Sequence, residues 1–325
     1  MKINLKQNSI SAIAFFGALL TAISGHTQTI NVKTKMSNEE ALSQMMSQYT
    51  APNLNIEARN GTTYAYRRFG RAGTVPLVLI QHFRGNLDSW DSELVDDIAA
   101  EREVILFDYS GVGLSTRSTP HTVEALARDA LAFIDALGLA KVDLLGFSLG
   151  GFVAQEVVLQ RPRLVRRLIL AGTGPQGGRD MHRWNEEISA HAYKDVQGAD
   201  DIFFLFFAQT ETSQAKARQF VERIFTRKRE RDKPATLAVR DAQAEAITAW
   251  GVPDMSKLAR LTGITQPTLV ANGNHDIMVP TVNSYLLAGH IPNAELIIYP
   301  DASHGFLFQY PHEFAASVNK FLAAE

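Results

Sequence analysis

Short runs of apolar residues recur along the chain and alternate with amphipathic stretches. Such runs predict strands that are buried on both faces, as in a parallel sheet covered by helices. The predicted strands lie at residues 75–81, 104–107, 142–147, 167–171, 268–271 and 296–299. Residues 64–69 instead alternate between apolar and polar types, which is typical of an antiparallel edge strand.

Helix-like periodicity fills the spaces between these strands. Apolar residues are spaced as on the buried face of a helix at residues 87–100, 123–137, 149–160 and 281–287. A last helix is predicted to start at Pro311. Strands that alternate with helices predict an α/β fold, which is a mostly parallel sheet with helices on both faces.

One stretch interrupts this alternation. Residues 173–263 contain no convincing buried strand, only helix-like segments rich in Phe, Arg and Glu. Residues 201–207 (DIFFLFF) are too aromatic for an exposed helix, so we expect them to pack against the core or a substrate pocket. Because loops of this length rarely lack structure, we predict a helical lid inserted into a core of residues 61–172 and 264–325.

The N-terminus predicts export. Lys2 and Lys6 precede an apolar stretch at residues 10–23, and small and polar residues follow it. This arrangement is typical of a secretory signal peptide and is short for a membrane span. We expect residues 1–24 to be a signal peptide and residues 25–60 a lead segment. The protein would then be periplasmic or secreted, without stable membrane association after processing, and cytoplasmic if the leader is not cleaved.

Composition narrows the classes of function. The 325 residues are 46% hydrophobic, as in a globular protein, and 32 basic against 34 acidic residues give a net charge of −2. We therefore expect no nucleic-acid partner. The sequence has no cysteine, which excludes disulfides and thiolate metal sites. Histidine and acidic residues are not clustered at zinc spacings, so we predict neither a metal nor a cofactor.

The segment GFSLG at residues 146–150 is the strongest indication of chemistry. A serine between two glycines, at a turn from strand to helix, is typical of a nucleophile elbow, in which a strained backbone lifts Ser148 above the sheet. The Leu149 N–H is then unpaired at a helix N-terminus, where it can stabilise an oxyanion. The alternative is a tight turn in which the Ser148 side chain merely caps the helix.

A serine nucleophile needs a base and a group that orients that base. His304 follows the last apolar strand and Asp276 follows the strand before it, at the edge where open sheets place their ligands. Asp301 is a rival acid, but it precedes His304 by three residues in one loop and would have to fold back. We predict Ser148 as the nucleophile, His304 as the base and Asp276 as the acid.

From about residue 61 onward the sequence resembles the α/β-hydrolase superfamily, in its branch of serine esterases and perhydrolases. The resemblance rests on GFSLG, on the loop of Asp276 with its Val-Pro, on DYSGVGLS at residues 108–115 and on SHGF at residues 303–306. These elements stand in the superfamily's order of serine, acid and histidine. The resemblance implies that residues 108–115 are architectural and hold the mouth of the site.

The sequence departs from this family's pattern after the strand at residues 75–81. Aligning Ser89-Trp90 with the family's common Ser-Trp implies that the Phe83 N–H is the second oxyanion donor, and it places His82 where glycine is usual. His82 and Arg84 either add polar contacts near the pocket or brace the loop. The sequence leaves these two roles open.

The resemblance implies a serine hydrolase that forms an acyl-enzyme. The expected partner is a small-molecule substrate, namely a small or medium, partly hydrophobic carboxylic ester or a related acyl or lactone compound. One alternative is cofactor-free perhydrolase or non-haem haloperoxidase activity, in which peroxide attacks the acyl-enzyme in place of water. The other is a non-catalytic ligand-binding protein of the same fold. The sequence predicts neither the acyl and alcohol groups nor the oligomeric state.

Overall fold

The computed structural model describes residue 43 and residues 46–324 of the chain. The predicted signal peptide and most of the predicted lead segment lie outside the described residues, so the signal peptide stays a prediction. In the part of the chain that is described, no helix is long and apolar enough to cross a membrane.

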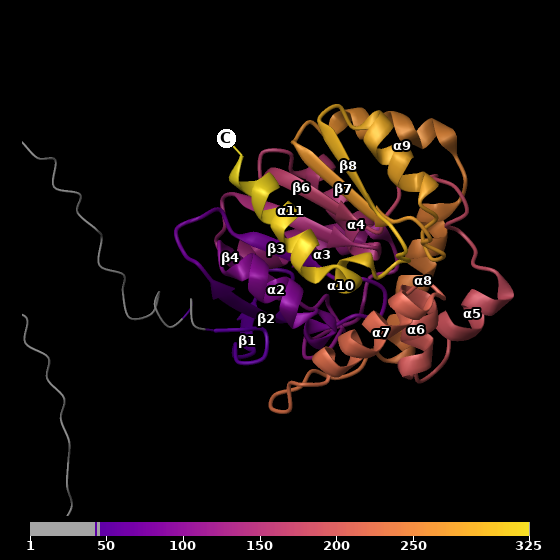
Figure 1. Ribbon diagram of the computed structural model, residues 1–325. Helices are drawn as coiled ribbons and strands as arrows, with labels where there is room; N and C mark the ends of the chain where they lie inside the picture. The colour runs from indigo at the N-terminus through magenta and orange to yellow at the C-terminus, as the bar shows by residue number, and fades with distance from the viewer. Residues whose placement is uncertain (1–42, 44–45, 325) are drawn as a thin grey trace, which may run out of the picture. The chain divides into compact units, whose positions relative to one another are not determined.

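Eight strands form one sheet in the order β1-β2-β4-β3-β5-β6-β7-β8 (Figure 1). Strand β2 pairs antiparallel with β1 and β4, and the remaining neighbours pair parallel. The strands are β1 (Leu54–Glu57), β2 (Thr63–Gly70), β3 (Leu77–Ile80), β4 (Glu103–Phe107), β5 (Val142–Phe147), β6 (Val165–Ala171), β7 (Thr268–Gly273) and β8 (Ala294–Tyr299). The predicted mostly parallel sheet is confirmed.

The edge of the sheet differs from the prediction. Strand β2 contains the segment predicted as the edge strand, but β1 lies outside it, with Leu54 opposite Tyr66. The edge position of β2 was therefore wrong. Strand β1 has only four residues, and its burial alternates between intermediate and exposed, so it lacks the apolar run that reveals a strand in a sequence.

The sheet carries an apolar core on each face. Successive residues of a strand point to opposite faces, and accordingly Leu77 and Leu79 of β3 join one apolar cluster while Val78 and Ile80 join the other. Helices α2 (Ser92–Ala99) and α11 (Pro311–Ala323) pack in the first cluster. The second cluster is covered by α3 (Val123–Ala136), α4 (Leu149–Gln160) and α9 (Val282–His290).

The helix predicted at residues 87–100 is divided into two elements. A 3₁₀ turn, η1 (Leu87–Ser89), precedes α2, and each has its own N-cap. The Asn86 side chain accepts from the Asp88 N–H, and the Asp91 side chain accepts from the Glu93 N–H. Because Asn and Asp bond readily to nearby backbone N–H groups, two such residues begin two helices instead of continuing one.

The chain between β6 and β7 forms helices. We call residues 173–263 the helical insertion. It holds α5 (Glu186–Ala192), α6 (Ala199–Phe206), α7 (Glu211–Ile224), α8 (Leu237–Gly251) and the 3₁₀ helix η2 (Met255–Gly263). In Figure 1, helices α5 to α8 gather at the lower right, beside one end of the sheet. A short helix, α10 (Phe306–Gln309), follows β8 and packs on α7.

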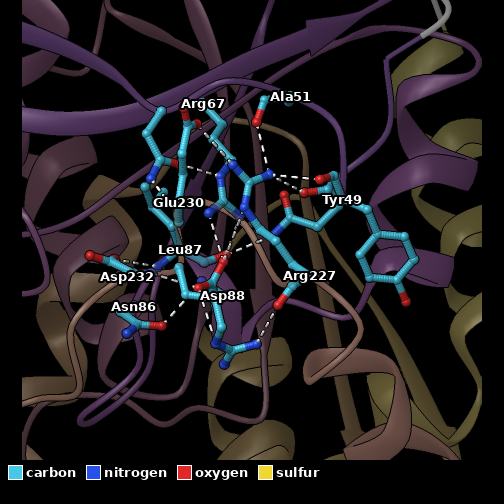
Figure 2. A network of polar contacts seen from close by, with 12 residues as sticks. Tyr49, Ala51, Arg67, Asn86, Leu87, Asp88, Arg227, Glu230 and Asp232 are labelled. Carbon is cyan, nitrogen blue, oxygen red and sulfur yellow. Dashed lines mark hydrogen bonds and ion pairs between the residues drawn. The ribbon is translucent and has the colours of Figure 1, made fainter.

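A buried polar network fastens the helical insertion to the core (Figure 2). At its centre, Asp88 accepts from Arg67 at 2.6 Å and from the backbone N–H of Asp232 at 2.8 Å. Arg227, which follows α7, lies 3.9 Å from the same carboxylate. The Arg227 guanidinium also donates to the carbonyl oxygens of Gln48, Tyr49 and Ala51. The Asp88 carboxylate thus joins η1 to β2 and the helical insertion, and Arg227 joins the insertion to the residues before β1.

Candidate active site

Ser148 occupies a strained turn between β5 and α4. Its backbone is left-handed, with φ 56° and ψ −119°, a conformation that costs free energy and persists only where the surroundings enforce it. The surroundings are tight: a Cβ atom on Gly150 would lie 2.0 Å from the Ile80 carbonyl oxygen, and one on Gly146 would lie 2.3 Å from the Gly150 oxygen. The Ser148 side chain makes no capping hydrogen bond, so the alternative of a mere helix cap is wrong.

His304 and Asp276 meet in the loops that follow β8 and β7. The His304 Nδ1 atom lies 2.8 Å from Asp276 Oδ2, and both side chains are buried. Since a carboxylate accepts, Nδ1 carries the hydrogen, and Nε2 of the neutral ring keeps its lone pair. The other carboxylate oxygen of Asp276 accepts from the N–H groups of Met278 and Val279, at 2.8 and 2.9 Å. The carboxylate is therefore held in one orientation.

Asp301, the rival acid, has a different partner. Its carboxylate accepts from the Thr210 hydroxyl of the helical insertion, at 2.8 and 3.1 Å. Its backbone is left-handed, with φ 49°. The structure therefore brings Asp276, and not Asp301, to the ring of His304.

Ser148 and His304 line one cavity of about 110 Å³. Its core side also includes Phe83 and Met278. The helical insertion supplies the opposite wall, with Gln197, Ile202, Leu205, Phe206, Phe220 and Ile224. The prediction that residues 201–207 pack against the core or a pocket is confirmed, because three of these residues line the cavity while Phe207 is buried in the core.

The two predicted oxyanion donors are unpaired. Among the described residues, the backbone N–H groups of Phe83 and Leu149 donate to no protein acceptor. Leu149 is the first residue of α4, where a backbone N–H has no partner within its own helix. Phe83 lines the cavity from the loop that follows β3. Both groups are available to an acceptor other than the protein.

Arg84 ties this loop to the helical insertion. Its backbone is left-handed, with φ 62°, and its N–H donates to Gln243 Oε1 on α8 at 2.7 Å. Its guanidinium donates to three carbonyl oxygens at the end of α5 and just after it, those of Ala192, Lys194 and Asp195, at 3.2, 2.6 and 3.0 Å. Of the two roles that the sequence leaves open for Arg84, these contacts are those of a brace.

The imidazole of His82 is half-buried beside Phe83. Nδ1 lies 2.9 Å from the Phe83 carbonyl oxygen, and the His82 N–H donates to Gln81 Oε1 at 2.9 Å. Burial lowers the pKa of His82 to about 3; the bond to Phe83 opposes this shift and the nearby His304 adds to it. The ring is therefore neutral at pH 7.

Gln243 is a residue of this site that the sequence did not indicate. It is fully buried, yet it stands in a mixed polar and apolar stretch of α8, where a glutamine is typical of a surface position. Its role depends on Arg84, which lies 159 positions earlier in the chain. Only the fold brings the two together, so no local pattern could have found it.

The model of the alpha/beta hydrolase fold family matches residues 75–311. The chain therefore belongs to the alpha/beta hydrolase family. A solved alpha/beta hydrolase fold protein from Chitinophaga pinensis is 40% identical to it, with a TM-score of 0.81, and the match covers 86% of this chain and 100% of that one.

Two curated relatives are more distant. The poly(3-hydroxyalkanoate) depolymerase of Ectopseudomonas oleovorans is 28% identical over 278 residues, which are 83% of this chain and 92% of that protein. BpoC of Mycobacterium tuberculosis, whose name groups it with non-heme bromoperoxidases, is 26% identical over 263 residues, or 77% of this chain and 94% of that protein. Relatives at this identity include both hydrolases and bromoperoxidase-like proteins.

Proposed function

We propose that this protein is a serine hydrolase that cleaves carboxylic esters or lactones through an acyl-enzyme. The observation that carries the proposal is the buried pair of His304 Nδ1 and Asp276 Oδ2, 2.8 Å apart, beside a cavity that Ser148 also lines. A histidine whose outer nitrogen is held unprotonated can accept the proton of a serine hydroxyl.

The reaction follows from this arrangement. His304 Nε2 takes the proton of the Ser148 hydroxyl as Oγ attacks the substrate carbonyl carbon. The carbonyl oxygen becomes an oxyanion, to which the N–H groups of Phe83 and Leu149 donate. His304 then gives the proton to the leaving alcohol oxygen, which leaves Ser148 acylated. A water molecule then attacks the acyl carbon as His304 takes its proton. The bond from this carbon to Ser148 Oγ breaks, His304 returns the proton to Oγ, and the acid leaves.

The cavity wall indicates the size and polarity of the acyl group. The wall of the cavity that Ser148 lines is mainly apolar, with Leu205 and Phe206 from α6 and Met278 from the core. A cavity of about 110 Å³ holds a short acyl chain and little more. A small, partly hydrophobic acyl group is the substrate that this wall supports.

A second candidate is perhydrolysis by the same residues. It is favoured by the likeness to BpoC, whose name groups it with non-heme bromoperoxidases. Hydrogen peroxide would replace water in deacylation, and the acyl-enzyme would release a peracid. Measuring bromination of monochlorodimedone with and without acetate separates this reaction from simple hydrolysis, since only a peracid formed from the acyl group makes bromination depend on acetate.

Labelling of the nucleophile tests the proposal. A fluorophosphonate probe should modify Ser148, and the Ser148→Ala variant should lose labelling and lose kcat by on the order of 10⁶-fold on p-nitrophenyl esters. Ser110→Ala is the matched control, because Ser110 is also buried but bonds to Asp129 away from the cavity. Labelling that persists in Ser148→Ala would overturn the proposal.

A further inference from the structure

The proposed reaction leaves the imidazole of His82 without a role. We propose that His82 Nε2 is a hydrogen-bond acceptor in the acyl pocket that selects substrates with a hydroxyl or amide N–H close to the scissile carbonyl. This inference rests on the proposed function and specifies its substrate class.

The tautomer of His82 is fixed by its neighbour. Nδ1 lies 2.9 Å from the Phe83 carbonyl oxygen, and a carbonyl oxygen can only accept. Nδ1 therefore carries the ring hydrogen, and Nε2 of the neutral ring holds a lone pair. The low pKa of His82, caused first by burial, keeps the ring in this neutral form throughout the pH range of an ordinary assay.

The Nε2 atom is open to a ligand. Among the described residues no protein donor reaches it, and it is not one of the partnerless polar atoms that are sealed from solvent. His82 lines the same cavity as Ser148 and His304. Its ring meets those of Phe147 and Phe206 edge to face, with centroids 5.2 Å away in each case, so the acceptor is held in place.

The position of His82 indicates where the substrate donor lies. Phe83, the next residue, supplies one of the two proposed oxyanion donors and bonds to the His82 ring through its carbonyl oxygen. An acceptor this close to the oxyanion site can reach a donor on the first carbons of the acyl chain. A plain alkyl chain would cover Nε2 and leave it without a partner, which is costly in a desolvated pocket.

The test compares esters that differ only in this donor. The probes are the p-nitrophenyl esters of butyrate, 3-hydroxybutyrate and N-acetylglycine, so the hydroxyl and amide sources are separate arms. For at least one donor-bearing ester we expect a kcat/KM about 10-fold above that of butyrate in the wild type. In His82→Phe, which keeps a ring without an acceptor, the ratio should fall about 10-fold. Because the ratio is compared between enzymes, the intrinsic reactivity of each ester cancels.

Two further variants serve as a second test and as a control. His82→Gly, which places the residue usual in the resembling family, should reduce the ratio as His82→Phe does, and serves if the latter does not fold. His290→Phe removes an exposed imidazole on α9, outside the cavity, and should leave the ratio unchanged. A ratio that is the same in wild type, His82→Phe and His82→Gly would overturn the role of His82. Loss of Ser148 dependence would instead overturn the proposed function, so the two failures are distinguishable.

Discussion

The two sides of the cavity are held in different ways. On the core side, backbone groups position the side chains: the Ser148 N–H donates to Ala171 O at 2.9 Å, and two backbone N–H groups orient Asp276. On the side of the helical insertion, most polar ties run through side chains, above all those of Arg84 and Asp88, although the Gly305 N–H also donates to Phe206 O at 2.6 Å. The proposed catalytic residues thus rest on the sheet, whereas the pocket wall depends largely on contacts that single substitutions can remove.

The largest effect should come from the core side. Asp276→Asn should lower kcat by on the order of 10⁴-fold, because an amide no longer holds the His304 ring in the useful tautomer. Asp301→Asn is the matched control and should keep near-normal kcat, since its carboxylate bonds to Thr210. Steady-state kinetics on p-nitrophenyl esters measure both. If the two variants exchange these outcomes, the assignment of the acid is wrong.

The second-largest effect should be a loss of stability when the buried network that joins the helical insertion to the core is broken. Asp88→Asn removes the charge that faces the fully buried Arg67, and breaking one side of a buried pair costs about 3 kcal/mol. The free energy of unfolding in urea measures this loss. Asp135→Asn, which breaks the exposed pair of Asp135 and Arg161, should cost at most about 1 kcal/mol. Equal losses in the two variants would contradict a special role for the network.

A smaller effect on kcat is expected from the bonds of Arg84, which join the two sides of the cavity. Arg84→Ala releases the segment after α5 from the loop of Phe83, and we expect kcat to fall by on the order of 10-fold through misplacement of that loop. Arg240→Ala loosens the same segment at Tyr193 and Asp195 without touching the Phe83 loop. Its kcat should stay within about 2-fold of the wild type. An equal fall of kcat in both variants would show that kcat depends on the segment after α5 and not on its bonds to Arg84.

The smallest effect concerns Asp108. Burial first, then its neighbour Asp232, raises the pKa of Asp108 well above the usual range. Because the folded-state pKa is raised, the contribution of Asp108 to stability is fully present below the unfolded-state pKa, near 3.9. This contribution is lost as the pH rises from there to the folded-state pKa. Asp108→Asn imitates the neutral form at every pH. It should therefore gain stability relative to the wild type at pH 8 and gain less at pH 5. Urea unfolding at both pH values measures the difference, and a larger gain at pH 5 would contradict it.

The same contrast explains what the sequence could predict. Strand runs, the glycines around Ser148 and the positions of Asp276 and His304 after strands are local patterns, and the fold places the ends of parallel strands at one edge. Gln243 and Arg227 are different, because their partners lie 159 and 178 positions away and nothing in their own stretches indicates burial. The two caps that divide residues 87–100 were missed because each depends on one polar residue and not on periodicity. Strand β1 was missed because four half-exposed residues contain no apolar run.

The bonds from Arg227 to Gln48, Tyr49 and Ala51 have a consequence for the order of synthesis. Tyr49 is made 178 residues before Arg227, so its carbonyl oxygen must stay hydrated while most of the sheet is being translated. A growing chain can pair β1 with β2 early, since these strands are adjacent in sequence. Gln48 can bond to Leu87 and Asp96 early, but the bonds to Arg227 can form only after the ribosome has passed the end of α7. We therefore expect this stretch to reach its full resistance to proteases later than the neighbouring strands.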